Sequence, residues 1–242
     1  MTKARGLLIT GTDTGVGKTQ VTAVLAMALR SRGLRVGVMK PAETGCPLKQ
    51  GYLAPQDSLF LQQISGCRAP QELVTPYPFL EPLAPAVAAQ HEGREIDLAH
   101  IVSCYRRLAH EHDIVLVEGA GGLLVPLTRE ESFLDLAVRL HLPLLVVARN
   151  ILGTINHTAL TVIVASRYCR VLGIVLNTLS PEVEDESQAS NREALQIWGR
   201  APLLGVLPYC PERTPESLLA QCAYIDLTTI LTQLSLSTKN EV

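Results

Sequence analysis

Residues 11–19, GTDTGVGKT, place three glycines and a closing Gly-Lys-Thr between a short apolar run and a long amphipathic pattern. The glycines let the backbone turn back, so that several N–H groups point into one concavity at the start of the helix that we expect to follow. Such a concavity favours a polyphosphate anion. The chain is therefore expected to form a strand-loop-helix unit that holds the phosphates of ATP with Mg²⁺.

The loop departs by one place from the usual pattern GxxxxGK[ST]. The residue five before Gly17 is Thr12, and Gly11 lies one place too early. In this variant loop we expect Lys18 to reach the β- and γ-phosphates and the Thr19 hydroxyl to coordinate Mg²⁺. An ordinary glycine-rich turn is the alternative, which the closing Gly-Lys-Thr and the flanking elements disfavour. The loop residues predicted to bind the nucleotide are Gly15, Val16, Gly17, Lys18, Thr19 and Gln20.

Short apolar runs alternate with helical patterns along the chain. The runs typical of fully buried strands are 6–10, 36–40, 114–118, 142–148, 171–177 and 203–207. Apolar residues recur at three- and four-residue steps over 17–31, 98–111, 155–170 and 188–198. This alternation predicts an α/β fold of the P-loop NTPase type, a parallel sheet joined by right-handed crossovers with helices on both faces.

Composition limits the size of the fold and the class of partner. The 242 residues, 47% of them hydrophobic, suit one large domain spanning 1–242. A net charge of -2 without a long basic run gives no footprint for nucleic acid or an acidic membrane. No apolar run approaches the ~18 residues that cross a bilayer, and residues 1–5 lead into a strand and not into the apolar core of a signal peptide. The six cysteines lack the spacing of a metal site or a redox motif. We expect a cytoplasmic protein with reduced thiols and small-molecule partners.

Two segments show weak periodicity. Residues 41–85 are rich in Pro, Gly and Gln, with one short helix expected around 57–64. Residues 180–190 are polar and are expected to form an exposed loop before the next helix. His110 and His112 flank the end of the helix predicted over 98–111, where a partial positive charge suits the helix dipole, and no metal spacing involves them.

Functional residues are expected at the carboxyl edge of the sheet. Glu118 ends an apolar strand, as the acidic residue that holds the metal beside a P-loop often does, and is a Mg²⁺ candidate. Residues 119–122, GAGG, allow backbone to approach a ligand closely, although a strand end with a flexible turn is the alternative.

Two further residues are ambiguous when considered alone. Asp57 opens a predicted helix, where an N-cap is a commoner role than metal ligation. Lys40 ends a strand before Pro41, which directs the side chain off the sheet edge. A lysine in that position is usually solvated, but beside a P-loop it can stabilise a transferring phosphoryl group.

Taken together, five segments resemble the dethiobiotin synthetase family. They are TDTGVGKT at 12–19, KPAETG at 40–45, Asp57, VEGAGG at 117–122 and LGTINH at 152–157. The resemblance implies an ATP-dependent ligase of biotin biosynthesis that joins 7,8-diaminopelargonate and CO₂ in a ureido ring. A carbamate forms on one amine and is phosphorylated, and the second amine closes the ring with release of ADP and phosphate.

The resemblance also implies the role of individual residues. Lys40 with Lys18 would be catalytic, Thr19, Asp57 and Glu118 would bind Mg²⁺, and Thr44 would contact the substrate. The remaining residues expected at the nucleotide are Gly119, Ala120, Gly121, Asn177, Thr178, Pro208, Tyr209 and Cys210, with Asn177 reading adenine and the last three forming the base loop. Glu216 is placed there less securely because the spacing is longer. The segment 152–157 implies a homodimer. Residues 49–56 and 228–242 match no part of the family pattern.

Two other classes of protein share such a loop. Partitioning and septum-placement ATPases are switches with a signature lysine inside the loop, which is absent near Asp13, and the segment from 228 on makes a poor membrane-binding helix. Amide-forming relatives such as cobyrinic acid amidases need a fused glutaminase domain, for which we expect no room in 242 residues.

Overall fold

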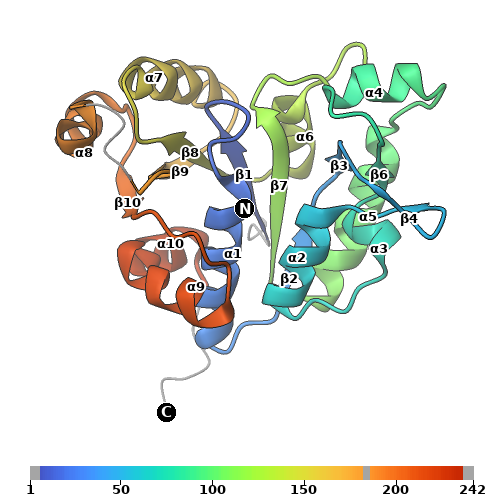
Figure 1. The fold of residues 1–242 in the computed structure, drawn as a ribbon, viewed down its shortest axis with the longest axis horizontal. Coiled ribbons are helices and arrows are strands. Elements are labelled where there is room, and N and C mark those ends of the chain that lie inside the picture. The colour runs from blue at the N-terminus through green and yellow to red at the C-terminus, as the bar shows by residue number, and fades with distance from the viewer. Residues whose placement is uncertain (1–5, 182–185, 237–242) are drawn as a thin grey trace.

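The structure is a computed structural model and describes residues 6–181 and 186–236. Its centre is a six-stranded sheet in the order β10-β9-β8-β1-β7-β2, and every pair of neighbouring strands is parallel. The strands are β1 Gly6–Gly11, β2 Val36–Met39, β7 Ile114–Gly122, β8 Leu144–Arg149, β9 Val171–Asn177 and β10 Leu203–Leu207. Figure 1 shows the strands at the centre of the molecule with helices around them.

The predicted strands are confirmed because their apolar runs lie in the interior. Leu7, Leu8 and Ile9 of β1 are fully buried, as are most side chains of β7 and β8. The chain thus forms a parallel sheet with both faces covered, the predicted P-loop NTPase fold class.

Four long helices lie where the helical periodicity predicts them. They are α1 Lys18–Ser31, α5 Leu98–Glu111, α7 Thr154–Ala165 and α8 Ser187–Trp198. Contacts group α1 with α2 (Gln56–Ser65) and α9 (Pro215–Gln221), α5 with α6 (Phe133–Leu140), and α7 with α8. Right-handed crossovers in this strand order place α1 and its neighbours on one face and α5 to α8 on the other.

Several short elements have no counterpart in the predicted set. They are α3 Gln71–Val74, α4 Pro85–His91, α6, α9, the 3₁₀ helix η1 Cys222–Tyr224 and α10 Leu227–Leu234. Of the 228–242 segment, α10 accounts for the part up to 234, and residues 237–242 lie outside the described residues.

Two predicted boundaries are wrong. The helix expected over 155–170 ends at Ala165. A short turn follows, and the Arg170 carbonyl accepts from the N–H of Leu144 (2.8 Å) where β9 joins β8. Residues 119–122 form no turn but continue β7, whose Gly122 pairs with Gly11 of β1. The strand therefore runs alongside the phosphate loop.

The weakly periodic segment 41–85 is folded. Besides α2 and α3 it holds the parallel pair β3 Ala42–Glu43 and β6 Tyr77–Pro78, and the hairpin β4 Leu48–Lys49 and β5 Tyr52–Leu53. Phe79 is fully buried, and its N–H donates to the Glu43 carbonyl (2.8 Å). The expected helix at 57–64 is α2, but its N-cap is Pro55, so Asp57 lies inside the first turn and is not the cap.

The second polar segment is partly helical. α8 begins at Ser187, within the loop expected over 180–190, and residues 182–185 lie outside the described part of the chain. The six cysteines are free thiols. Across 6–181 and 186–236, no helix has the length and apolar character needed to cross a membrane.

Candidate functional site

The phosphate loop between β1 and α1 is held in shape by glycines and by one asparagine. Gly15 and Gly17 have φ of 72° and 87°, a left-handed conformation that other residues rarely adopt. Asn177, at the end of β9, donates from Nδ2 to the Val16 carbonyl (3.0 Å) and is almost fully buried. A Cβ at position 17 would lie 2.0 Å from that Nδ2, so both space and backbone conformation require glycine there.

Lys18 folds back over the loop. Its Nζ donates to the carbonyl of Asp13 (3.2 Å), and the side chain is buried. Burial, the largest influence, together with the charge of Lys40, lowers the pKa of Lys18 to about 8 against the attraction of Glu118 and Asp13. An incoming polyphosphate would favour the charged amine.

Beside the loop, four predicted residues meet around one carboxylate. Glu118 of β7 accepts on Oε1 from the Thr19 hydroxyl (2.8 Å) and from Lys40 Nζ (2.8 Å). Lys40 Nζ also donates to Asp57 Oδ2, at the start of α2. The structure thus brings Thr19, Lys40, Asp57 and Glu118 together from four parts of the chain.

The charge of Lys40 is secured by its neighbours. Burial alone would lower the pKa of this amine, but the carboxylates of Glu118, Asp57 and Glu43 outweigh burial and raise the pKa above its ordinary value. Lys40 is therefore a permanent cation and not an acid or base at neutral pH.

The oxygen atoms of this cluster fit a hard divalent cation. Glu118 is fully buried, and its Oε2 is one of the buried polar atoms in the described residues without a hydrogen-bond partner. Together with the Asp57 carboxylate and the Thr19 hydroxyl, this oxygen forms the donor set that Mg²⁺ prefers. The described residues contain no group of three or more His, Cys, Asp and Glu placed to hold a metal. Phosphate and water oxygens would have to complete such a site.

Glu43, which the sequence analysis did not predict as a site residue, sets the position of Asp57. Its buried carboxylate accepts from the N–H of Asp57 (2.8 Å) and of Ser58 (3.0 Å). Burial, the largest cause, raises the pKa of Glu43. Because Pro55 has no side-chain acceptor, the first N–H groups of α2 need a remote one. That missing cap is the sequence signal that could have identified this residue.

Further along the sheet edge, three residues predicted at the nucleotide line a cavity of about 360 Å³. Its lining includes Thr178, Pro208 and Tyr209, together with Tyr224 of η1, which was not predicted. Asn177 lies between this cavity's Thr178 and the phosphate loop. The Cys210 thiol donates to the Glu212 carbonyl (3.1 Å) and is not part of the lining.

The remaining predicted residues lie apart from these contacts. Thr44 follows β3 and is partly exposed, and Glu216 lies in the first turn of α9. Gly119, Ala120 and Gly121 lie in the extension of β7, where a Cβ at position 121 would be 3.3 Å from the Thr14 hydroxyl oxygen.

A second cavity, of about 450 Å³, adjoins the phosphate loop. Thr12, Asp13 and Thr14 form its polar side. The opposite walls are mainly apolar and come from the segment after β7 and from α7, namely Leu123, Leu124, Val125, Pro126, Leu160 and Val164. The loop therefore borders a groove that suits a ligand with an aliphatic chain.

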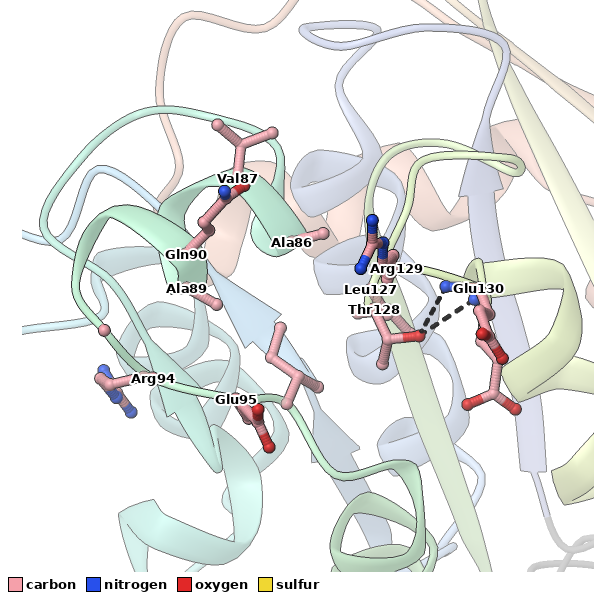
Figure 2. A pocket seen from close by; sticks show the side chains of 13 residues that line it. Ala86, Val87, Ala89, Gln90, Arg94, Glu95, Leu127, Thr128, Arg129 and Glu130 are labelled. Carbon is pink, nitrogen blue, oxygen red and sulfur yellow. Dashed lines mark hydrogen bonds between the residues drawn. The ribbon is translucent and has the colours of Figure 1, made fainter.

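A third cavity, of about 830 Å³, lies elsewhere. Figure 2 shows Ala86 and Gln90 of α4 on one side and Leu127, Thr128 and Arg129 on the other. Thr128 Oγ1 accepts from the N–H groups of residues 130 (3.2 Å) and 131 (3.0 Å), which shapes that wall. No predicted site residue lines this cavity.

Comparison with known sequences gives relatives over most of the chain. A protein-family model described as an AAA domain matches residues 5–217. A protein named ATP-dependent dethiobiotin synthetase BioD from Anaeromyxobacter sp. (strain K) is 49% identical over 86% of this chain and 92% of its own length. Proteins of the same name from Thermodesulfovibrio yellowstonii (38% identical; 88% of this chain, 92% of that protein) and Bacillus licheniformis (38%; 96% and 98%) are also similar.

Among solved structures, cell-division ATPases share the fold. The septum site-determining protein MinD of Pyrococcus horikoshii, complexed with Mg-ADP, has a TM-score of 0.57 over 93% of this chain and 88% of that one. The MinC:MinD complex of Aquifex aeolicus also has a TM-score of 0.57, over 99% of both chains. At 17% and 16% identity these likenesses show the fold alone.

Proposed function

The chain belongs to the ATP-dependent dethiobiotin synthetase family, and we propose that it catalyses the reaction this membership implies. The reaction is the carboxylation and ring closure of 7,8-diaminopelargonate with CO₂ and ATP, which yields dethiobiotin, ADP and phosphate in biotin biosynthesis. The observation that carries the proposal is the convergence of Thr19, Lys40, Asp57 and Glu118 beside a phosphate loop.

We propose that the phosphate end of ATP binds at the loop between β1 and α1. The N–H groups of the loop at the start of α1 would hold the β-phosphate, as the positive end of a helix favours. Lys18 would exchange the Asp13 carbonyl for phosphate oxygens. Mg²⁺ held by Thr19, Asp57 and Glu118 would supply charge neutralisation at the β- and γ-phosphates.

Lys40 would act at the transferring phosphoryl group. A carbamate that attacks the γ-phosphate brings two anions together, and a buried cation next to them lowers the barrier. Because Glu118 and Asp57 keep this amine charged and fixed, it needs no reorganisation at the moment of transfer. The chemistry requires no protein nucleophile, and holding the reactants in line is most of the catalytic work.

The groove beside the loop would take the diamine. Leu124, Val125 and Leu160 offer an apolar wall for the alkyl chain, and Thr14 lies at the end next to the phosphates. We further propose that Thr44 contacts the substrate through its hydroxyl group, as the family resemblance implies.

A homodimer would complete this groove. Leu124 and Leu160 line the groove and are 60% and 56% exposed, and Leu152, in the 152–157 segment, is 75% exposed. Apolar side chains gathered beside a ligand groove are typical of an interface. We propose that a second copy covers them, with the 152–157 segment near the partner's substrate.

Asn177 would join the base to the phosphate loop. One hydrogen of its amide nitrogen is given to the Val16 carbonyl, and the second can be donated to a ring nitrogen of adenine. Pro208, Tyr209 and the cavity that they line would receive the base and ribose. We propose a single ligase domain spanning 1–242 that works in the cytoplasm on small molecules, without nucleic acid or membrane.

The test follows ADP release by purified protein with ATP, Mg²⁺ and bicarbonate, with and without 7,8-diaminopelargonate. We expect release to require the diamine and to match dethiobiotin formed. ADP that appears equally fast without the diamine would reject the ligase and favour the alternative, an ATPase switch of the partitioning or septum-placement type. The shared fold with MinD does not by itself favour that alternative, because folds host many functions.

A further inference from the structure

Two buried glutamines connect the helix of the phosphate loop to the loop of the base cavity. Gln20, the third residue of α1, donates from Nε2 to Oε1 of Gln221 at the end of α9. Gln221 in turn donates from Nε2 to the carbonyl of Pro208 (3.0 Å). Gln20 and Gln221 are only 6% and 4% exposed, so solvent does not compete for these bonds.

The direction of these two hydrogen bonds is fixed by the Pro208 carbonyl. The Pro208 carbonyl can only accept, so Gln221 must present its amide nitrogen there and its oxygen to Gln20. Gln20 must then donate, which leaves its own Oε1 buried and without a partner in the described residues. The contact is therefore directional, and neither amide can flip without placing two acceptors against each other.

The contact lies beside the cavity that Pro208 and Tyr209 line. Tyr224, three positions after Gln221, lines the same cavity, and its neighbour Ile225 forms a bridge to Gly205 of β10. The residue after Gln221, Cys222, packs on α1 through a hydrogen bond from Sγ to the Val24 carbonyl (3.5 Å). Gln221 and Cys222 thus tie the end of α9 to α1, and Gln221 alone also bonds to Pro208 in the cavity lining.

We propose that Gln221, with Gln20, is a positioning residue that holds the nucleoside pocket in register with the phosphate loop. The inference rests on the proposed use of ATP and adds a residue to that site. It implies that loss of Gln221 weakens binding of the nucleoside part of the ligand while the phosphate part is held as before.

The test compares two ligands on the full chain by calorimetry with Mg²⁺ present. ADP has both parts, whereas inorganic tripolyphosphate has phosphates alone. Gln221→Met keeps the length of the side chain and removes the one amide that bonds to both Gln20 and Pro208. We expect ADP to bind about tenfold more weakly, an effect on the scale of buried hydrogen bonds. The dissociation constant for tripolyphosphate should change by less than about twofold, because the phosphate loop is not altered.

Cys222→Ala is the matched control. It removes a neighbouring contact to α1 without touching Pro208. We expect it to lower the melting temperature while the ratio of ADP to tripolyphosphate affinity stays at the wild-type value. In a double-mutant cycle, Gln221→Met should have a smaller effect on ADP binding when Gln20 is already Met, because the hydrogen bond between Gln20 and Gln221 is then already lost.

The remaining outcomes each contradict either the positioning role or the proposed nucleotide site. Equal weakening of both ligands, or of neither, would overturn the positioning role. A wild-type protein that binds tripolyphosphate but not ADP would instead reject the proposed nucleotide site, independently of what Gln221→Met does.

Discussion

At the scale of single residues, the site depends on carboxylates that each serve more than one partner. Glu118 Oε1 accepts from both Thr19 and Lys40, and Glu43 accepts two backbone N–H groups of α2. Short motifs could predict Lys40 and Glu118, whereas Asp57, an isolated residue, could be predicted only from the family resemblance. Motif spacing could not predict Gln221, whose partner Gln20 is 201 positions away and carries no local signal.

Lys40→Ala should reduce turnover far more than nucleotide binding, since the amine is proposed to act mainly at the transferring phosphoryl group. We expect kcat to fall by about 100-fold or more, the scale of losing one preorganised electrostatic contact. The affinity for ADP, measured by calorimetry, should change only a few-fold. Similar losses in both quantities would assign Lys40 to binding instead.

Glu43→Gln should destabilise the start of α2, because an amide has one acceptor oxygen where the carboxylate uses two. We expect a loss of about 1–2 kcal/mol in the free energy of unfolding, measured in urea, and a lower kcat as Asp57 moves. Glu130→Gln, an exposed acid without such bonds, is the control. Unchanged stability and kcat in Glu43→Gln would show that the two bonds do not position Asp57.

At the scale of elements, sequence periodicity predicted the central strands and long helices but not the short helices. Buried strands are runs of apolar residues whatever their neighbours, so six could be recognised. α6 has only eight residues and follows a polar turn. Its start carries a recognisable signal, since Asp135 accepts from the N–H (2.7 Å) and hydroxyl (2.6 Å) of Ser132, one half of a capping box.

Asp135→Ala should therefore lower stability at neutral pH by about 1 kcal/mol. Burial is the largest single cause and would raise the pKa of Asp135, but the hydrogen bonds from Ser132 together outweigh it and lower that pKa. A folded-state pKa below the unfolded value of about 3.9 gives stability that is present above that pH and lost as the pH falls through the folded pKa. Urea unfolding of Asp135→Ala and wild type should thus converge in acid. A difference that persists there would exclude the carboxylate as its cause.

At the scale of the whole molecule, the segment 41–85 was the hardest to predict. Its elements are two to ten residues long, and they are held by contacts with the rest of the chain, such as the Lys40 N–H to the Val74 carbonyl (2.8 Å). Local periodicity cannot report such contacts. As a result, Asp57 is placed in the site by a segment whose sequence alone suggests a loop.

Leu160→Glu should convert the proposed dimer to a monomer, because a carboxylate would have to be buried without a partner in the interface. Sedimentation velocity should show the mass of one chain, and turnover should fall if the partner completes the groove. Leu219→Glu, which alters an equally exposed leucine on α9, should stay dimeric. A wild-type protein that sediments as a monomer would reject the dimer itself.

The extension of β7 through Gly122 affects how the protein meets its nucleotide. Since Gly11 pairs with Gly122 and Asn177 holds Val16 from the other side, the phosphate loop is braced by two strands before any ligand arrives. Few backbone torsions remain to be ordered on binding, so little conformational entropy is lost at that step. The phosphate loop should therefore be preorganised and change little when phosphates bind. Any large conformational change should occur on the side of the site where the diamine binds.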